Sequence, residues 1–153
     1  MKTYWKCLCA GTLSGMRSLS AIALISRRQS HRKSPGLAAS PLAFLASPGV
    51  SRFLQTMAIG ELGGDKMPKA PARIAPLPLT IRALTGGVAG AALCFSEGER
   101  PATGALIGAL AAVASSFTFY YARRSAGRKL KLPDSVLGFA EDLTAGALAT
   151  VVR

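Results

Sequence analysis

The residues of this chain with the most chemical potential are acids that fall inside apolar segments. Glu61 continues the apolar stripe of a helix predicted over residues 48–62, and Asp65 follows one turn later if that helix continues. Glu141 and Asp142 stand at the centre of the last apolar segment. A carboxylate in such surroundings must be paired, protonated or next to a wet cavity, so these positions are candidate sites.

Basic partners for these acids are scarce within the apolar segments. Arg17 and Arg82 are the only basic residues well inside them, and Lys66 lies just beyond the helix that carries Glu61. We therefore expect Glu61 to be buried and paired with Arg17 or Arg82. The resulting charge cluster has two open interpretations: ion pairs that fix the register of the helices, or a path for an ion or a proton.

Common catalytic and metal-binding constellations are missing from the sequence. The single histidine, His31, supports neither a catalytic triad nor a histidine metal site, and no phosphate-binding glycine loop is present. Cys7, Cys9 and Cys94 are too few for a complete disulfide framework, and they suit small packing positions. We expect no cofactor and no metal, and an enzyme ranks last among the functions considered.

Composition points to a bilayer rather than to water or nucleic acid. The 153 residues are 50% hydrophobic and 17% charged, with a mean hydropathy of +0.32. A soluble domain of this size would leave much apolar surface exposed. The net charge of +12 comes from short clusters between apolar segments, without a zinc-finger, basic-helix or RNA-binding signature, so we expect no nucleic-acid partner.

Two segments have the length and composition of membrane helices, and together they predict a helical hairpin over residues 77–122. The acidic turn from Ser96 to Pro101 connects them. Aromatic residues followed by two arginines end the second segment, as at a membrane boundary. Each helix carries two glycines four residues apart, which predicts close helix packing. These glycines are Gly86, Gly90, Gly104 and Gly108.

The other apolar segments are interrupted or short. Residues 7–25 contain Arg17 and two glycines, residues 48–62 are amphipathic, and residues 135–152 contain two acids. We predict an all-α fold, a compact multi-pass transmembrane domain over residues 1–153 with broken or re-entrant helices. Its remaining parts are a basic loop at 26–36, an interfacial or re-entrant helix at 48–62, a proline-rich loop at 66–78, a basic loop at 123–133 and a C-terminal helix at 135–152.

The apolar side of the helix over residues 48–62 is expected to face other helices. Its members recur at helical spacing and are Val50, Phe53, Leu54, Met57 and Ala58, whereas Ser51, Arg52, Gln55 and Thr56 share the opposite side. If this helix lies along the interface or re-enters, the connections at 26–36, 66–78 and 123–133, which all carry basic residues, lie on the cytoplasmic side. The acidic turn then faces outward by the positive-inside rule.

Several of these residues together resemble an uncharacterised family of small membrane proteins, domain of unknown function 4126. The resemblance rests on Gly15-Met16-Arg17-Ser18, on residues 60–68 (GELGGDKMP), on Arg82 with its following Gly-Ala run, and on Glu141-Asp142. It covers residues 11–152 and implies a multi-pass protein, most often of the bacterial inner membrane. The first 60 residues lack acids, as transit peptides do, but the resemblance implies that Arg17 belongs to the mature fold.

Two functions follow from this sequence. The leading hypothesis is passage of a small ion or solute through a helical bundle with buried charges. The alternative is a non-transporting scaffold that binds lipid or a partner subunit through basic cytoplasmic segments. The expected partners are the lipid bilayer and a second copy or another membrane protein.

Overall fold

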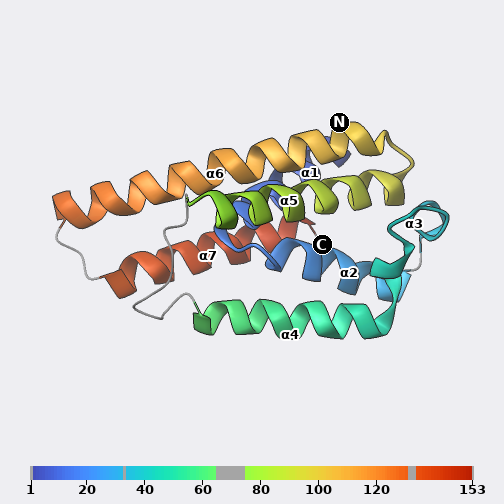
Figure 1. Ribbon diagram of the computed structural model, residues 1–153, viewed down its shortest axis with the longest axis horizontal. Coiled ribbons are helices and arrows are strands. Elements are labelled where there is room, and N and C mark those ends of the chain that lie inside the picture. The colour runs from blue at the N-terminus through green and yellow to red at the C-terminus, as the bar shows by residue number, and fades with distance from the viewer. Residues whose placement is uncertain (1, 33, 65–74, 131–133, 153) are drawn as a thin grey trace.

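The computed structural model describes residues 2–32, 34–64, 75–130 and 134–152, and every regular element in these ranges is helical (Figure 1). The all-α prediction is therefore confirmed for the described part of the chain. In order, the elements are α1 (Lys2–Met16), α2 (Ser20–Arg32), α3 (Pro35–Ala38), the 3-10 helix η1 (Ala43–Ala46), α4 (Pro48–Gly64), α5 (Pro76–Glu97), α6 (Pro101–Leu130) and α7 (Asp134–Val152).

Two basic segments expected to be loops are mostly helical. Helix α2 continues to Arg32, through most of the basic loop expected at residues 26–36, and α6 continues to Leu130 through most of the one expected at 123–133. Arginine and lysine are good helix formers, so a run of them does not end a helix as proline or glycine does. Of the proline-rich loop expected at 66–78, residues 66–74 lie outside the described ranges, and α5 begins at Pro76.

Helices α1, α5 and α6 pack through glycines. A Cβ atom on Gly86 of α5 would lie 2.8 Å from the Cβ of Ala112 on α6, and a Cβ on Gly90 would collide with the backbone of Gly104. Gly108 of α6 faces α5 on one side and α1 on the other, where Gly11 would place a Cβ against its carbonyl group. Small residues therefore let three backbones approach one another closely.

Large apolar side chains of the same helices point outward. On α5, Leu77 is 72% exposed and Leu84 is 63% exposed, and on α6, Leu106 and Leu110 are each 61% exposed. Glycine and alanine thus form the close helix contacts, and Leu13, Met16 and Leu93 are large buried side chains of this core. Several leucines of α5 and α6 nevertheless lie on the outer surface, which is unusual for a water-soluble domain. Within the described ranges, two helical stretches are long and apolar enough to cross a membrane: Pro76–Glu97 and Pro101–Ala122.

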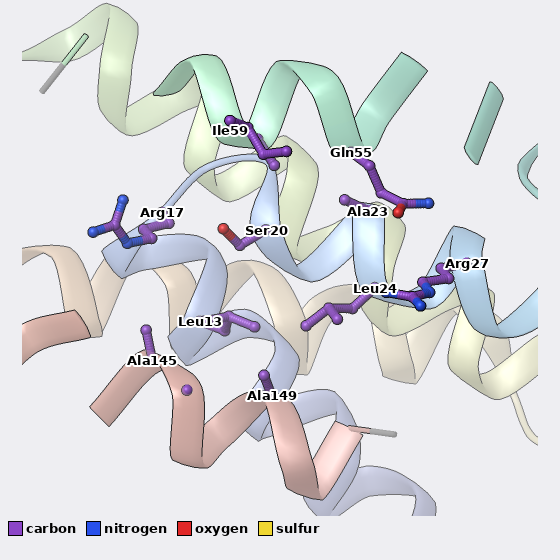
Figure 2. Close-up of a pocket in the computed structure, with 12 residues that line it drawn as sticks. Leu13, Arg17, Ser20, Ala23, Leu24, Arg27, Gln55, Ile59, Ala145 and Ala149 are labelled. Atoms are coloured by element: carbon purple, nitrogen blue, oxygen red, sulfur yellow. The ribbon is translucent and has the colours of Figure 1, made fainter. Parts of the chain in front are cut away.

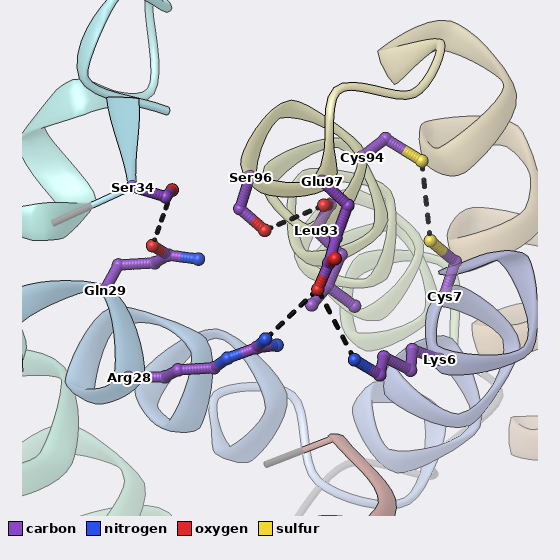
Figure 3. A network of polar contacts seen from close by, with 9 residues as sticks. All are labelled: Lys6, Cys7, Arg28, Gln29, Ser34, Leu93, Cys94, Ser96 and Glu97. Carbon is purple, nitrogen blue, oxygen red and sulfur yellow. Dashed lines mark hydrogen bonds and ion pairs between the residues drawn. The ribbon is translucent and has the colours of Figure 1, made fainter. Parts of the chain in front are cut away.

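One end of the bundle carries a network of charged side chains (Figure 3). The carboxylate of Glu97, at the end of α5, accepts hydrogen bonds from Lys6 Nζ at 3.4 Å and from Arg28 Nη2 at 3.1 Å. The hydroxyl of Tyr4 donates to Glu99 at 3.2 Å. The expectation that the first basic segment and the acidic turn lie on opposite sides is therefore wrong, because opposite charges have drawn them together at the same end.

Candidate functional site

Helices α1 and α2 form an antiparallel hairpin whose tip is a short non-helical segment at residues 17–19. Lys6 near the start of α1 and Arg28 near the end of α2 both contact Glu97, so the two outer ends lie together. Gly15, just before the tip, contacts Arg82, which precedes Glu97 by 15 residues on the same helix. Gly15 follows Lys6 by nine residues on α1, so at a rise of 1.5 Å per residue the tip lies about 14 Å below the charged end.

The tip is capped by Glu61 from α4. Its two carboxylate oxygens accept hydrogen bonds from the backbone N–H groups of Ser18, at 2.7 Å, and Leu19, at 3.0 Å. These N–H groups immediately precede α2, so a negative charge there also interacts favourably with the positive end of the helix dipole. Glu61 thus acts as an N-terminal cap supplied from another helix.

This arrangement corrects the expected ion pair of Glu61 with Arg17 or Arg82. Glu61 is half-buried rather than buried, and its hydrogen-bond partners are backbone N–H groups. The physical reason is that the non-helical tip leaves N–H groups without intrahelical acceptors, and a carboxylate satisfies two of them at once. A sequence pattern shows charged side chains but does not show where backbone donors become available.

Arg82 caps the C-terminal end of α1. Arg82 is 4% exposed, and its guanidinium donates through Nη1 to the carbonyl oxygen of Gly15 at 3.0 Å. The hydroxyl of Ser116 on α6 lies 3.1 Å from the same oxygen and 2.7 Å from the carbonyl oxygen of Ala112. The hydroxyl of Ser115 lies 3.2 Å from the carbonyl oxygen of Thr12 and 3.1 Å from that of Ala112. A cation beside the last carbonyls of α1 is favoured by the helix dipole, so Glu61 and Arg82 stabilise the two sides of one hairpin tip.

A groove of about 390 Å³ adjoins the tip, between the α1–α2 hairpin, α4 and α7 (Figure 2). Arg17 and Arg27 lie at opposite ends of it, with Ser20 between them. Gln55 of α4 adds a fourth polar side chain, and the other described lining residues are apolar or glycine. These other residues are Leu13, Ala23, Leu24, Ala58, Ile59, Ala145, Gly146 and Ala149.

Helix α4 turns only part of the expected face toward the bundle, where Val50 and Leu54 pack against the buried core. Phe53 is 62% exposed and Met57 is 42% exposed, whereas Ser51 is buried and Gln55 is half-buried. The expectation that Phe53 and Met57 face other helices is therefore wrong. Ser51 and Gln55 are hydrogen-bonded to each other along the inward side, so their polar groups stay satisfied there.

The predicted charge cluster is only partly visible in the described structure. Arg17, Glu61 and Arg82 all surround the hairpin tip, although no direct ion pair joins Glu61 to either arginine in the part of the chain that the structure describes. Glu141 and Asp142 belong to α7, but their side chains lie outside what is described. The remaining two members, Asp65 and Lys66, also lie outside the described residues.

Ser20, Arg27 and Gln55 belong to the groove, and sequence reasoning missed them as candidate site residues. The apolar periodicity places Gln55 on the polar outer side of its helix, and the run of basic residues places Arg27 in a loop. Gln55 lies six residues before Glu61, about 120° away around the helix, so its register gave no signal for the groove. No sequence signal places Arg27 in the groove, because its position depends on α2 continuing as a helix through the basic run.

A second polar contact ties α1 to α5 near the charged end. The buried thiols of Cys7 and Cys94 lie 3.7 Å apart, and the Cys7 thiol also donates to the carbonyl of Gly90 at 3.4 Å (Figure 3). Cys9 is buried too, and all three thiols are free. Within the described ranges, no group of three or more potential metal-ligating side chains is found.

Comparison with known proteins gives no family for this chain. No family model, no curated protein and no solved structure matches it. The resemblance to domain of unknown function 4126 therefore stays a prediction from the quoted motifs, and the function has to be argued from the geometry of the hairpin tip and the groove.

Proposed function

We propose that the chain is a multi-pass protein of the cell membrane, in bacteria the inner membrane, that lets a small ion or solute pass through the groove beside the hairpin tip. In this proposal α5 and α6 cross the bilayer. The α1–α2 hairpin enters from the charged end and returns to it. The groove is the place where the solute leaves water.

The depth of the tip supports a re-entrant hairpin. The hydrocarbon core of a bilayer is about 30 Å thick, and a tip about 14 Å below the charged end stops short of the other surface. Neither α1, with 15 residues, nor α2, with 13, is long enough to span by itself. The outward leucines of α5 and α6 suit contact with acyl chains.

The single observation that carries the proposed passage is the Glu61-capped tip next to the groove. Non-helical backbone at membrane depth is tolerated only where protein buries it or where it lines a wet cavity. Broken helices with capped ends near the middle of the membrane mark the binding sites of many transporters. Arg17 at the tip lines the groove together with Ser20 and Gln55, so part of its lining is polar.

The membrane arrangement is tested by cysteine labelling in sealed vesicles, in a background with Cys7, Cys9 and Cys94 replaced by serine. A re-entrant hairpin predicts that Arg32→Cys and Gly98→Cys react from the same side with an impermeant thiol reagent, and Ser125→Cys from the other. Labelling of Arg32→Cys and Gly98→Cys from opposite sides would end the re-entrant arrangement. Release of the wild-type chain by alkaline carbonate would end the membrane-spanning proposal.

Passage is tested by tracer flux in reconstituted vesicles, with sodium, chloride and acetate as probes. We expect Gln55→Leu, which replaces a polar groove residue, to lower flux strongly. The matched control is Thr56→Leu, which changes the next, exposed residue of α4 and should leave flux unchanged. Folded protein that carries none of the three probes above the rate of protein-free vesicles would contradict passage of small ions.

The second candidate function is a non-transporting scaffold that binds lipid or a partner subunit. The observation that favours it is the exposure of Arg27 and Arg32 at the charged end of α2, where they can reach anionic headgroups. Reduced lipid or partner binding on neutralising both residues, with no flux in the wild-type chain, would select this function.

A further inference from the structure

From the lining of the groove we infer that its ligand is a long-chain carboxylate, a fatty acid anion, with the carboxylate at Arg27 and the chain running toward Ser20 and Leu13. This inference names the substrate class of the groove, and it rests on the membrane arrangement proposed above. It adds a chemical identity that the proposed passage of a small solute leaves open.

The charge of the lining selects an anion. Among the described lining residues, Arg27 is the cation nearest the charged end, and none is an acid. Arg27 is exposed, and its guanidinium has no hydrogen-bonding partner among the described side chains. A carboxylate matches a guanidinium in charge and in its forked geometry, so Arg27 is suited to bind one.

The apolar part of the lining selects a hydrocarbon chain. Leu24 and Ala23 of α2, Ile59 of α4 and Ala149 of α7 surround the space between the two arginines. A volume of about 390 Å³ lies in the lower part of the range of about 300–1,000 Å³ for small-molecule sites. The groove therefore fits one acyl chain better than the two chains of a phospholipid.

The position of Arg27 selects the direction of the ligand. Arg27 precedes Arg28, whose guanidinium contacts Glu97 at the charged end, so Arg27 lies near the proposed membrane surface. Ser20 lies seven residues earlier on α2, about 10 Å deeper at 1.5 Å per residue. A fatty acid entering with its carboxylate at the surface and its chain toward the tip thus has the orientation it already has in a bilayer.

The experiment uses the full chain in lipid nanodiscs with a long-chain fatty acid that carries a photoactivatable diazirine in its tail. After illumination, mass spectrometry should find the probe on groove residues of α4 and α7, such as Ile59 and Ala149. Unlabelled palmitate should compete for labelling, whereas hexadecanol, which has the same chain but no charge, should compete about tenfold less well.

Two pairs of variants test the two halves of the ligand. Arg27→Gln should weaken labelling about tenfold, and Arg32→Gln, which removes an exposed charge outside the groove, should not. Ala149→Phe, which fills the groove, should abolish labelling, and Ala147→Phe on the exposed side of the same helix should not. If Ala149→Phe does not fold, Ile59→Trp narrows the groove from its exposed wall instead.

Several outcomes would overturn the inference. Equal competition by palmitate and hexadecanol, or no effect of Arg27→Gln, would remove the requirement for a carboxylate. Labelling outside the groove, or competition by a two-chain phosphatidylglycerol but not by palmitate, would remove the fatty acid. Groove labelling without flux of sodium, chloride or acetate would contradict only the proposed passage of a small ion or solute. Flux of one of these probes without groove labelling would contradict only this inference.

Discussion

The two halves of this molecule use glycine and alanine in opposite ways. In the α1–α5–α6 core, Gly90 and Gly108 bring backbones into contact, and a single added methyl group has no room. On the α2–α4–α7 side, a methyl group added at Gly60 or Gly146 would have nothing within 4 Å, and small residues border the groove instead. Small residues stabilise a helix contact only where a second backbone approaches. Elsewhere they leave space that a ligand can fill.

The largest expected effect distinguishes the two halves directly. Gly90→Ala should destabilise the protein by about 3 kcal/mol or more, because its Cβ would overlap the Gly104 backbone, which cannot rotate away. Gly60→Ala, the matched control, should be neutral or stabilise by about 0.5–1 kcal/mol, because alanine favours the helix. Thermal unfolding in detergent measures both changes. Similar melting temperatures for the two variants would contradict the proposed contrast.

The next largest effect concerns the buried cation that joins the core to the hairpin tip. Arg82→Met should cost about 1.5–3 kcal/mol, since it removes a charged donor to the Gly15 carbonyl. Arg124→Met, at an exposed position of α6, should change stability by less than about 0.5 kcal/mol. The same unfolding measurement applies, and equal stability of the two variants would show that Arg82 does not hold the tip in place.

A smaller effect is expected at the boundary between the two halves. Glu61→Gln should cost about 1–2 kcal/mol, because the amide accepts through one oxygen and loses the charge that favours the start of α2. Glu99→Gln, in the exposed turn, should cost less. Folding and flux are measured in the same preparation. Intact folding with lost flux would assign Glu61 to the solute path, and no change in either property would remove it from the site.

The smallest effect is expected at the charged end. Glu97→Gln should cost about 0.2–1 kcal/mol, since its contacts with Lys6 and Arg28 are partly exposed to solvent. The difference between Glu97→Gln and the wild-type chain should shrink in high salt, which screens such pairs. A salt-independent loss above about 2 kcal/mol would mean that the α1–α2 hairpin depends on this network rather than on the glycine core and the capped tip.

Much of the fold was predictable from local sequence. The long apolar runs, the turn with Pro101 and the glycine spacing predicted the α5–α6 pair, because helix formation and close packing follow from residue types within a few turns. The presence of a helix at α4 was also predictable from neighbouring residues, but the face that it turns inward was not. Gly11 and Gly15 have the same four-residue spacing as the glycines of α5, yet their contact with α6 was missed because Arg17 interrupted the segment.

The sequence by itself determined which segments are helical and apolar, since hydropathy and helix propensity act over neighbouring residues. Only the tertiary structure decided which face of each helix turns inward. An apolar helix face can be covered by protein or by another apolar environment, and the hydropathy of its residues does not distinguish the two cases. For the same reason the partner of Glu61, 42 residues or more away at Ser18 and Leu19, was beyond local reasoning. The two backbone N–H groups that bind Glu61 have no intrahelical partners, because folding places them at the non-helical hairpin tip.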